Sequence, residues 1–113
     1  SVLRDFRLRR AINLLSERLG EPVDLAEISR SAGLSRPHFF KLFREQMGLP
    51  PTIFLNALRM ERAIERLARG KETVSEIGLD LGFATPASFS RFFIANGVVP
   101  PSAYRRSVAG LTH

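Results

Sequence analysis

The chain has 113 residues, of which 44% are hydrophobic, and its 17 Lys and Arg outnumber its 11 Asp and Glu. This composition suffices for one ordinary packed domain or two very small ones, and it argues against a disordered chain. The absence of cysteine excludes disulfides, thiolate metal sites and cysteine nucleophiles, and the formal charge of +6 favours an acidic partner such as nucleic acid.

The first predicted helix covers residues 3–19. Apolar residues recur there every three or four positions, from Leu8 to Leu19, while most charged residues lie off that stripe. A basic amphipathic helix of this kind can lie on a membrane surface, but the apolar side is better explained as part of a protein core. Gly20 is expected to end the helix, and no membrane partner is expected.

Two further helices are predicted before residue 50. Asp24 precedes Glu27 by three residues, a spacing that predicts a capping box at the start of a short helix, which Gly33 ends. Ser35 is expected to cap the next helix, which tolerates Pro37 in its first turn and runs to residue 47. A short helix, a turn opened by glycine and a longer helix together form a helix-turn-helix motif.

The longest predicted helix follows two prolines and covers residues 51–69. Its buried side is expected to contain Phe54, Ala57, Leu58, Ile64 and Leu67, and its exposed side Arg59, Arg62, Glu65, Arg66 and Arg69. A helix of this length spans about 28 Å, and successive major-groove openings on one face of DNA lie roughly 34 Å apart. Such a connector suits two groove insertions by a single chain.

The same pattern then restarts. Thr73 and Glu76 repeat the capping box, Gly82 repeats the break, and Thr85 is expected to cap a helix with Pro86 at its first position. A last short helix is expected after the second pair of prolines, at 100–101. The predicted fold is therefore all-α, with about seven helices: one helix-turn-helix subdomain over 1–50, a linker helix over 51–70, and a second helix-turn-helix subdomain over 71–113.

Each predicted unit carries two phenylalanines that flank a basic residue, Lys41 in the first unit and Arg91 in the second. The two phenylalanines of a unit share one face of the helix and are expected to be buried. The basic residue between them must then project to the other side. In a DNA-binding motif, that other side enters the major groove.

Four segments together resemble a known family: LAEISRSAGLSRPHFFKLFREQMG, LRMERAIERLARG, SEIGLDLGFATPASFSRFF and VPPSAYRR. On these segments, the chain from about residue 3 to 106 resembles the DNA-binding domain of AraC/XylS-type bacterial transcription regulators. The resemblance implies seven helices and two helix-turn-helix units bridged by the fourth helix. It also implies sequence-specific binding of double-stranded DNA, with the second helix of each unit in a major groove on one face.

The groove side of each second helix supplies the candidate base-reading residues. They are Arg36, Pro37, Phe40, Lys41 and Arg44 in the first unit, and Thr85, Pro86, Ala87, Ser90 and Arg91 in the second. Family members carry a base-reading Arg or Lys where Lys41 stands. Arg91 is the strongest single candidate, because a bidentate Arg on guanine is the commonest specific contact. Its alternative role is a surface ion pair with Asp80.

Phe40 also has two interpretations. It can contact a thymine methyl group, or it can belong to the core beside Phe39 and Phe43. Burial of all three would need a wider apolar stripe than so small a unit requires, so exposure is favoured. Two residues depart from the family pattern: Val98 stands where a glycine is expected, and Ile94 where a basic residue is usual. They suggest an altered end to the helix and one phosphate contact fewer.

Phosphate contacts are expected from Ser35, Arg30, Arg59, Arg105 and Arg106. No catalytic residue, metal site or cofactor is expected. His38 and His113 are the only histidines, and neither has an acidic residue at metal-ligand spacing. The lack of cysteine separates the chain from alkyl-acceptor repair proteins that share this helical architecture. The alternative function is a helix-turn-helix module that binds protein, which acidic groove positions would favour; here those positions are basic.

The resemblance has further implications for the whole protein. Family members usually carry an effector-binding or dimerisation domain before the DNA-binding part, and contact with RNA polymerase is implied for an activator. The chain begins SVLRDF, without an initiator Met. We therefore expect a fragment of a cytoplasmic regulator whose effector-binding domain is missing from this sequence.

Overall fold

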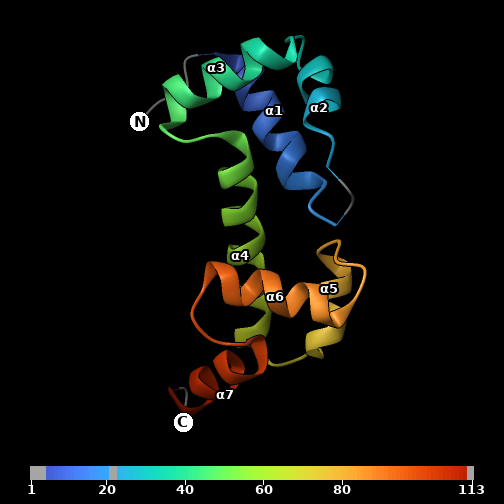
Figure 1. The fold of residues 1–113 in the computed structure, drawn as a ribbon, viewed down its shortest axis with the longest axis vertical. Coiled ribbons are helices and arrows are strands. Elements are labelled where there is room, and N and C mark those ends of the chain that lie inside the picture. Colours follow the sequence, from blue (N-terminus) through green and yellow to red (C-terminus); the bar gives the residue numbers. More distant parts are fainter. Residues whose placement is uncertain (1–4, 21–22, 112–113) are drawn as a thin grey trace. The chain divides into compact units, whose positions relative to one another are not determined.

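The computed structural model describes residues 5–20 and 23–111, and this part of the chain forms seven helices in two compact units (Figure 1). Unit 1 is Ser1–Ala57 and unit 2 is Leu58–His113. The helices are α1 Phe6–Glu17, α2 Leu25–Ser31, α3 Arg36–Met47, α4 Pro51–Arg69, α5 Val74–Asp80, α6 Pro86–Asn96 and α7 Pro101–Leu111. The predicted all-α fold is confirmed. The boundary between the units lies within α4, so the long helix contributes residues to both.

The predicted caps account for most of the helix starts. Ser35 accepts a hydrogen bond from the backbone N–H of His38 at 3.2 Å. Thr73 closes the predicted capping box with Glu76: its hydroxyl accepts from the N–H of Glu76, whose carboxylate accepts from the N–H of Thr73. Because each cap is made by residues within three positions of one another, the sequence is sufficient to locate it.

Two expectations at helix ends were wrong. The first helix begins at Phe6, because the Asp5 carboxylate caps it by accepting from the N–H of Arg7 at 2.9 Å, and it ends at Glu17 with Arg18 as its C-cap. Residues 3 and 4 of the predicted helix lie outside the described residues. Asp24 caps α2 as predicted, but the Glu27 carboxylate accepts from the Arg18 side chain at 3.1 Å instead of closing a capping box.

Both helix-turn-helix motifs make the same turn. Gly33 has φ +81° and Gly82 has φ +94°, a left-handed conformation that strains any residue with a Cβ. The residue after each glycine donates its N–H to the carbonyl five positions back, Leu34 to Ser29 at 2.9 Å and Phe83 to Gly78 at 3.0 Å. These are the hydrogen bonds of a Schellman motif. The duplication seen in the sequence is therefore also a duplication of backbone structure.

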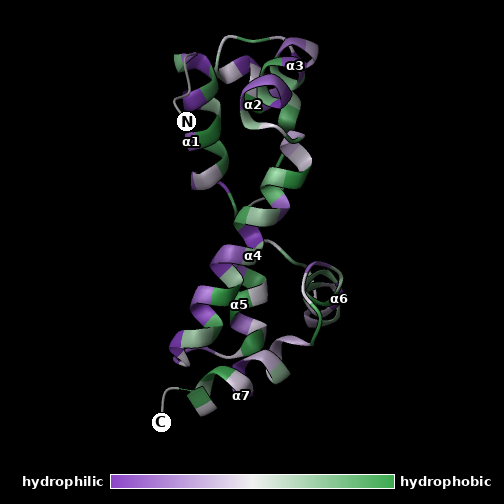
Figure 2. Cartoon of the chain, turned by 90° about the vertical axis from the view of Figure 1, so that its left-hand side faces the viewer, coloured by the Kyte–Doolittle hydropathy of each residue, from purple (hydrophilic) through white to green (hydrophobic). Residues whose placement is uncertain are grey.

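The two phenylalanines that flank the basic residue of each motif are buried, as predicted. Phe39, Phe43 and Phe89 are 0% exposed, and Phe93 is 2% exposed. In unit 1, α3 contacts α1 and α2, and the Phe43 ring meets that of Phe54 in α4. In unit 2 the core consists of Ala63, Leu67, Ile77, Leu81, Phe89 and Phe93. Figure 2 shows apolar residues alternating with polar ones along the helices, as expected for helices with one buried side.

The buried side of α4 differs from the predicted one. Pro51, Leu55, Ala63 and Leu67 are buried, whereas Ala57 and Ile64, both expected in the core, are exposed. These buried residues lie on one row with a spacing of four, and Arg59 occupies the remaining position of that row. Because one member of this row, Arg59, is charged, hydrophobic periodicity did not indicate that the row is buried. The helix thus half-buries an arginine that the pattern had placed on the exposed side.

An ion-pair network joins α4 to α5 in unit 2. The Arg66 guanidinium donates to both Glu72 oxygens and to Asp80 Oδ2, the last at 2.7 Å. The hydrogen bonds from Arg66 lower the pKa of the Glu72 carboxyl below its ordinary value. A carboxyl whose pKa is lower in the folded chain stabilises the fold above its unfolded pKa. That contribution is lost as the pH falls through the folded value.

Glu72→Gln is therefore expected to make the stability of unit 2 less dependent on pH in the acidic range. Urea unfolding followed by circular dichroism between about pH 6 and pH 3 measures the effect, and the wild-type midpoint should fall further on acidification than that of the variant. Glu61→Gln removes an exposed carboxylate of α4 that forms no ion pair with a described residue, so its midpoint should follow the wild type. Equal acid sensitivity of Glu72→Gln and wild type would contradict the role of this network.

Candidate nucleic-acid interface

The candidate base-reading residues of α3 lie on the side of the helix opposite the buried phenylalanines. Arg36, Pro37, Lys41 and Arg44 are exposed, and Phe40 is half-buried. Among the described residues, neither Lys41 nor Arg44 forms an ion pair, so their charges face solvent unneutralised. This face of α3 therefore presents three positive charges and one aromatic ring.

Phe40 fits neither of its two predicted roles completely. Its ring meets the buried Phe39 edge to face, with centroids 5.8 Å apart and planes at 90°. The guanidinium of Arg36 lies 4.6 Å from the centroid of the Phe40 ring. The ring is thus at the edge of the core, with one neighbour apolar and the other cationic.

The corresponding face of α6 is less charged. Thr85, Pro86, Ala87 and Arg91 are exposed, and Ser90 is half-buried. The hydroxyl of Thr85 accepts from the N–H of Ser88, and the hydroxyl of Ser88 accepts from the N–H of Thr85. The part played by Ser88 was not predicted, although Thr85 and Ser88 have the spacing of a capping box.

Arg91 is the only long charged side chain among the predicted groove positions of α6. Its predicted alternative partner, Asp80, is bound to Arg66. Within the described part of the chain, Arg91 forms no ion pair. The alternative interpretation of Arg91 as the partner of Asp80 is therefore wrong, and its guanidinium is accessible to a ligand.

The expected phosphate contacts fall into two groups. Ser35, Arg30 and Arg106 are exposed, and the Ser35 hydroxyl, which accepts from His38, still has its own proton to donate. Arg59 and Arg105 are half-buried instead of solvated. The spacing of Arg59 from Leu55 and Ala63 was the sequence signal that could have revealed this.

The two half-buried arginines have packing roles in unit 2. Arg105 Nε donates to the carbonyl of Leu67 at 3.2 Å, which ties α7 to the end of α4. The Arg59 guanidinium lies 6.0 Å from the centroid of the Phe83 ring, and burial lowers its pKa. Arg59 Nε and Arg105 Nη2 are buried without a hydrogen-bond partner among the described residues. Arg105 thus joins α7 to α4, and Arg59 lies beside the turn of the second motif.

The two departures from the family pattern lie at the end of α6. The helix ends at Asn96, and Gly97 is the C-cap, with its N–H donating to the Phe93 carbonyl at 2.8 Å. Ile94 is 44% exposed, at the position that Arg44 occupies in the first motif, and Val98 is 89% exposed. The end of α6 consequently presents apolar surface where the end of α3 presents a positive charge.

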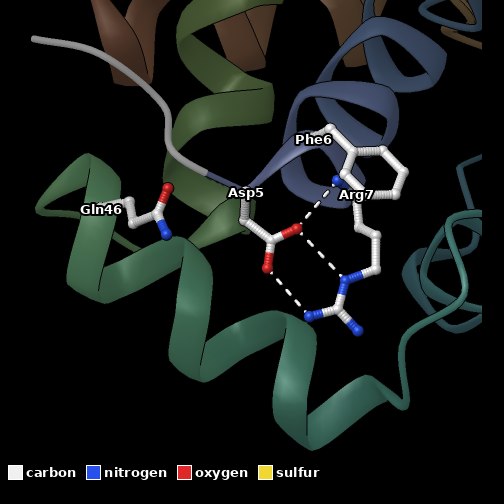
Figure 3. Close-up of a pocket in the computed structure, with 4 residues that line it drawn as sticks. All are labelled: Asp5, Phe6, Arg7 and Gln46. Carbon is white, nitrogen blue, oxygen red and sulfur yellow. Dashed lines mark hydrogen bonds and ion pairs between the residues drawn. The ribbon is translucent and has the colours of Figure 1, made fainter.

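In the described residues, one hollow lies away from these faces, and a second is lined in part by Thr85 and Pro86 of the α6 face. In unit 1, Asp5, Phe6, Arg7 and Gln46 line a hollow of about 470 Å³ (Figure 3). The Asp5 carboxylate is already occupied there by Arg7, whose Nη2 lies 2.9 Å away, and these hydrogen bonds lower the pKa of Asp5. In unit 2, a smaller apolar hollow of about 150 Å³ lies beside the start of α6. Neither hollow offers a set of convergent unpaired polar groups.

Two other classes of site are absent from the described ranges. No group of three or more His, Asp and Glu side chains in residues 5–20 and 23–111 could hold a metal ion. Over the same residues, no helix combines the length and the apolar character that crossing a bilayer requires. The charged faces of α3 and α6 are accordingly the strongest candidate site of the described chain.

Comparison with known proteins gives consistent results. A family model described as a helix-turn-helix domain matches residues 28–107. The chain is 32% identical over 112 residues to an uncharacterized HTH-type transcriptional regulator of Staphylococcus aureus, covering 99% of the chain and 15% of that protein. It is 28% identical over 108 residues to a similar regulator of Haemophilus influenzae, covering 96% of the chain and 36% of that protein. The chain thus spans only a minor part of these relatives.

Solved structures share the fold. An AraC-type transcriptional regulator from Chromobacterium violaceum matches with a TM-score of 0.81 and 27% identity, covering 91% of this chain and 92% of that one. The DNA-binding domain of the global transcriptional factor AdpA, solved in complex with a target DNA, matches with a TM-score of 0.83 and 26% identity, covering 92% and 94%. The likeness extends over both helix-turn-helix units.

Proposed function

The chain belongs to the AraC-type family of helix-turn-helix domains of transcription regulators, and we propose that it binds double-stranded DNA sequence-specifically, with α3 and α6 as its two recognition helices. Each helix would enter a major groove, in adjacent grooves on one face of the duplex. The observation that carries this proposal is the duplicated motif, in which an exposed basic residue, Lys41 or Arg91, lies between two buried phenylalanines. The structure of AdpA with its target DNA supports the proposal by analogy.

Unit 1 is proposed to read more of the DNA sequence than unit 2. Arg36, Lys41 and Arg44 all have donors that suit guanine, and each is exposed. In unit 2 only Arg91 combines length and charge, whereas Ala87 offers a methyl group alone. A recognition helix with one long donor specifies fewer base pairs than a helix with three.

Phosphate binding is proposed for the exposed residues Ser35, Arg30 and Arg106, which would fix the register on the duplex without reading sequence. For Arg59 and Arg105 we propose that support of unit 2 comes first, because both are half-buried and Arg105 binds the Leu67 carbonyl. Substitution of these two would therefore change folding and DNA affinity together, which makes them poor probes of phosphate contact.

The wider role proposed is regulation of transcription in the bacterial cytoplasm, with RNA polymerase as a protein partner and an effector-binding domain elsewhere in the whole protein. The family supports this role. The S. aureus and H. influenzae relatives are much longer than the chain, which matches 15% and 36% of their lengths.

Selection from random duplex DNA at about 0.15 M salt tests the proposed function. Enrichment of two short, non-palindromic blocks about ten base pairs apart is expected if both recognition helices read DNA. A single block would mean that only one unit specifies sequence, and unit 1 is expected to be that unit. Absence of enrichment, with binding that disappears as salt rises, would refute specific recognition and favour the protein-binding alternative.

Arg91→Ala is expected to reduce discrimination at one base pair of the selected site by about tenfold, because a bidentate Arg–guanine contact is lost. Competition binding with single-base variants of the site measures this. The matched control is Arg106→Ala, an exposed arginine of the same unit. It should weaken all duplexes alike and reduce the slope of log affinity against log salt by about one. Uniform, sequence-blind losses for both variants would contradict base reading by Arg91.

A further inference from the structure

One residue of the α3 face is assigned a different role by its contacts. Phe40 stands among the groove-facing residues, yet its ring already has two close neighbours: Phe39, with its plane perpendicular, and the Arg36 guanidinium over its face. We propose that Phe40 is a positioning residue, whose ring holds the Arg36 guanidinium ready for a base, and not a direct reader of thymine. This inference rests on the proposed function, because it names how unit 1 would achieve specificity.

The Phe40 ring is held by the core of unit 1. Phe39 is 0% exposed and meets the Phe40 ring at 5.8 Å with perpendicular planes. Phe39 in turn contacts Phe43, with centroids 5.6 Å apart. This chain of aromatic contacts anchors the orientation of the Phe40 ring to fully buried side chains. The ring is therefore a fixed surface at the border between the core and the exposed face of α3.

Arg36 gains a defined position from this surface. It is the first residue of α3 and is exposed, so its long side chain would otherwise sample many rotamers. At 4.6 Å from the ring centroid, the guanidinium lies within the range of a cation–π interaction. Holding a donor in place before binding reduces the entropy lost when it meets its ligand. A cation–π contact needs no acceptor oxygen, so the N–H groups of the guanidinium that do not face the ring remain available for bonding.

The spacing of the pair follows from the helix. Arg36 and Phe40 are four residues apart, so their side chains are neighbours on one face. The second motif has Pro86 and Ser90 at the corresponding positions and cannot form such a pair. The pair of a guanidinium and an aromatic ring four residues apart is thus particular to α3 in unit 1. It accounts for an aromatic residue on a face whose other long side chains are all cationic.

The test is a double-mutant cycle on the site selected by the wild-type chain. Arg36→Ala is expected to relax preference at one base pair, and Phe40→Leu to relax preference at that same base pair by about two- to fivefold. The double variant should show no more loss than Arg36→Ala alone, because Phe40 acts through Arg36. Phe40→Tyr keeps the ring and should retain the preference. Leu42→Ala, at a half-buried position of the same helix, should lower stability without changing preference at that base pair.

Two results would overturn the inference while leaving the proposed function intact. If Phe40→Leu instead relaxed base preference at a different base pair, one that contains a thymine, Phe40 would be a direct reader. Additive losses in the double variant, or an Arg36→Ala variant with unchanged preference, would remove the coupling. Failure of the wild-type chain to select any sequence would instead refute the proposed function itself.

Discussion

Phe43→Ala is expected to lower the free energy of unfolding of unit 1 by about 3–5 kcal/mol, the range for truncation of a fully buried aromatic side chain. Phe43 is 0% exposed and lies between two other rings, with centroids 5.6 Å from Phe39 and 5.3 Å from Phe54. These contacts join α3 to the beginning of α4. Alanine would leave a cavity that the neighbouring rings cannot fill without breaking their own contacts.

The matched control is Phe6→Ala in the same unit. Phe6 is 67% exposed at the start of α1, so the same chemical change should alter stability by less than about 0.5 kcal/mol. Urea unfolding followed by circular dichroism measures both variants. If the two units unfold in separate steps, only the transition of unit 1 should shift. A loss below about 1 kcal/mol for Phe43→Ala, or equal losses for the two variants, would contradict the packing described for α3.

The loss should extend to DNA binding, because α3 carries the charged face. At a urea concentration where the wild-type chain is folded and Phe43→Ala is partly unfolded, the variant should lose affinity for the selected site. Added site DNA should then restore its folded population, since a ligand that binds only the folded form stabilises it. Affinity equal to that of the wild type under these conditions would contradict a role for α3 in recognition.

Local features of the fold could be predicted from the sequence because local chemistry determines them. The caps Asp24, Ser35, Thr73 and Thr85 each bind a backbone N–H within three residues. The left-handed turn at Gly33 depends on one residue type at one position. Such features need no knowledge of distant partners, and their repetition made the tandem architecture recognisable.

Features that depend on distant partners could not be predicted. The helices that pack on α4 determine which of its rows is buried. As a result, Arg59 lies on the buried row and Ile64 is 37% exposed. Glu27 has two possible donors, and the approach of Arg18 decides between them. Hydrophobic periodicity ranks the sides of a helix but does not identify the side that meets a neighbour.

In the candidate site, too, locally determined features could be predicted and contacts with distant partners could not. Helical spacing was enough to place Lys41 and Arg91 on exposed faces opposite the buried phenylalanines. It did not reveal that the Arg36 guanidinium lies over the Phe40 ring, or that Asp80 binds Arg66 and leaves Arg91 unpaired among the described residues. Those pairings depend on distances in space between side chains with several possible partners. The structure was needed to separate residues that face a ligand from residues that hold their neighbours.

Gly78→Ala is expected to destabilise unit 2 by about 1–3 kcal/mol, although alanine is the better helix former. A Cβ at position 78 would lie 2.8 Å from three atoms of Phe89, including its Cβ. Because the Cβ of Phe89 is fixed by the backbone, no change of rotamer relieves this contact, and α5 and α6 would have to separate. Separation would open the core around Phe89, which is 0% exposed.

The counterpart of Gly78 in the first motif shows that the motif itself does not require glycine. Ser29 stands there, 0% exposed, and its hydroxyl donates to the Leu25 carbonyl at 2.6 Å. The requirement therefore arises from the closer approach of α6 in unit 2.

Gly110→Ala in α7 is the matched control, since nothing lies within 4 Å of its added Cβ. It should leave stability unchanged or raise it by up to about 1 kcal/mol. Equal urea midpoints for Gly78→Ala and Gly110→Ala would mean that α5 and α6 can move apart at no cost, and the described packing of unit 2 would be wrong.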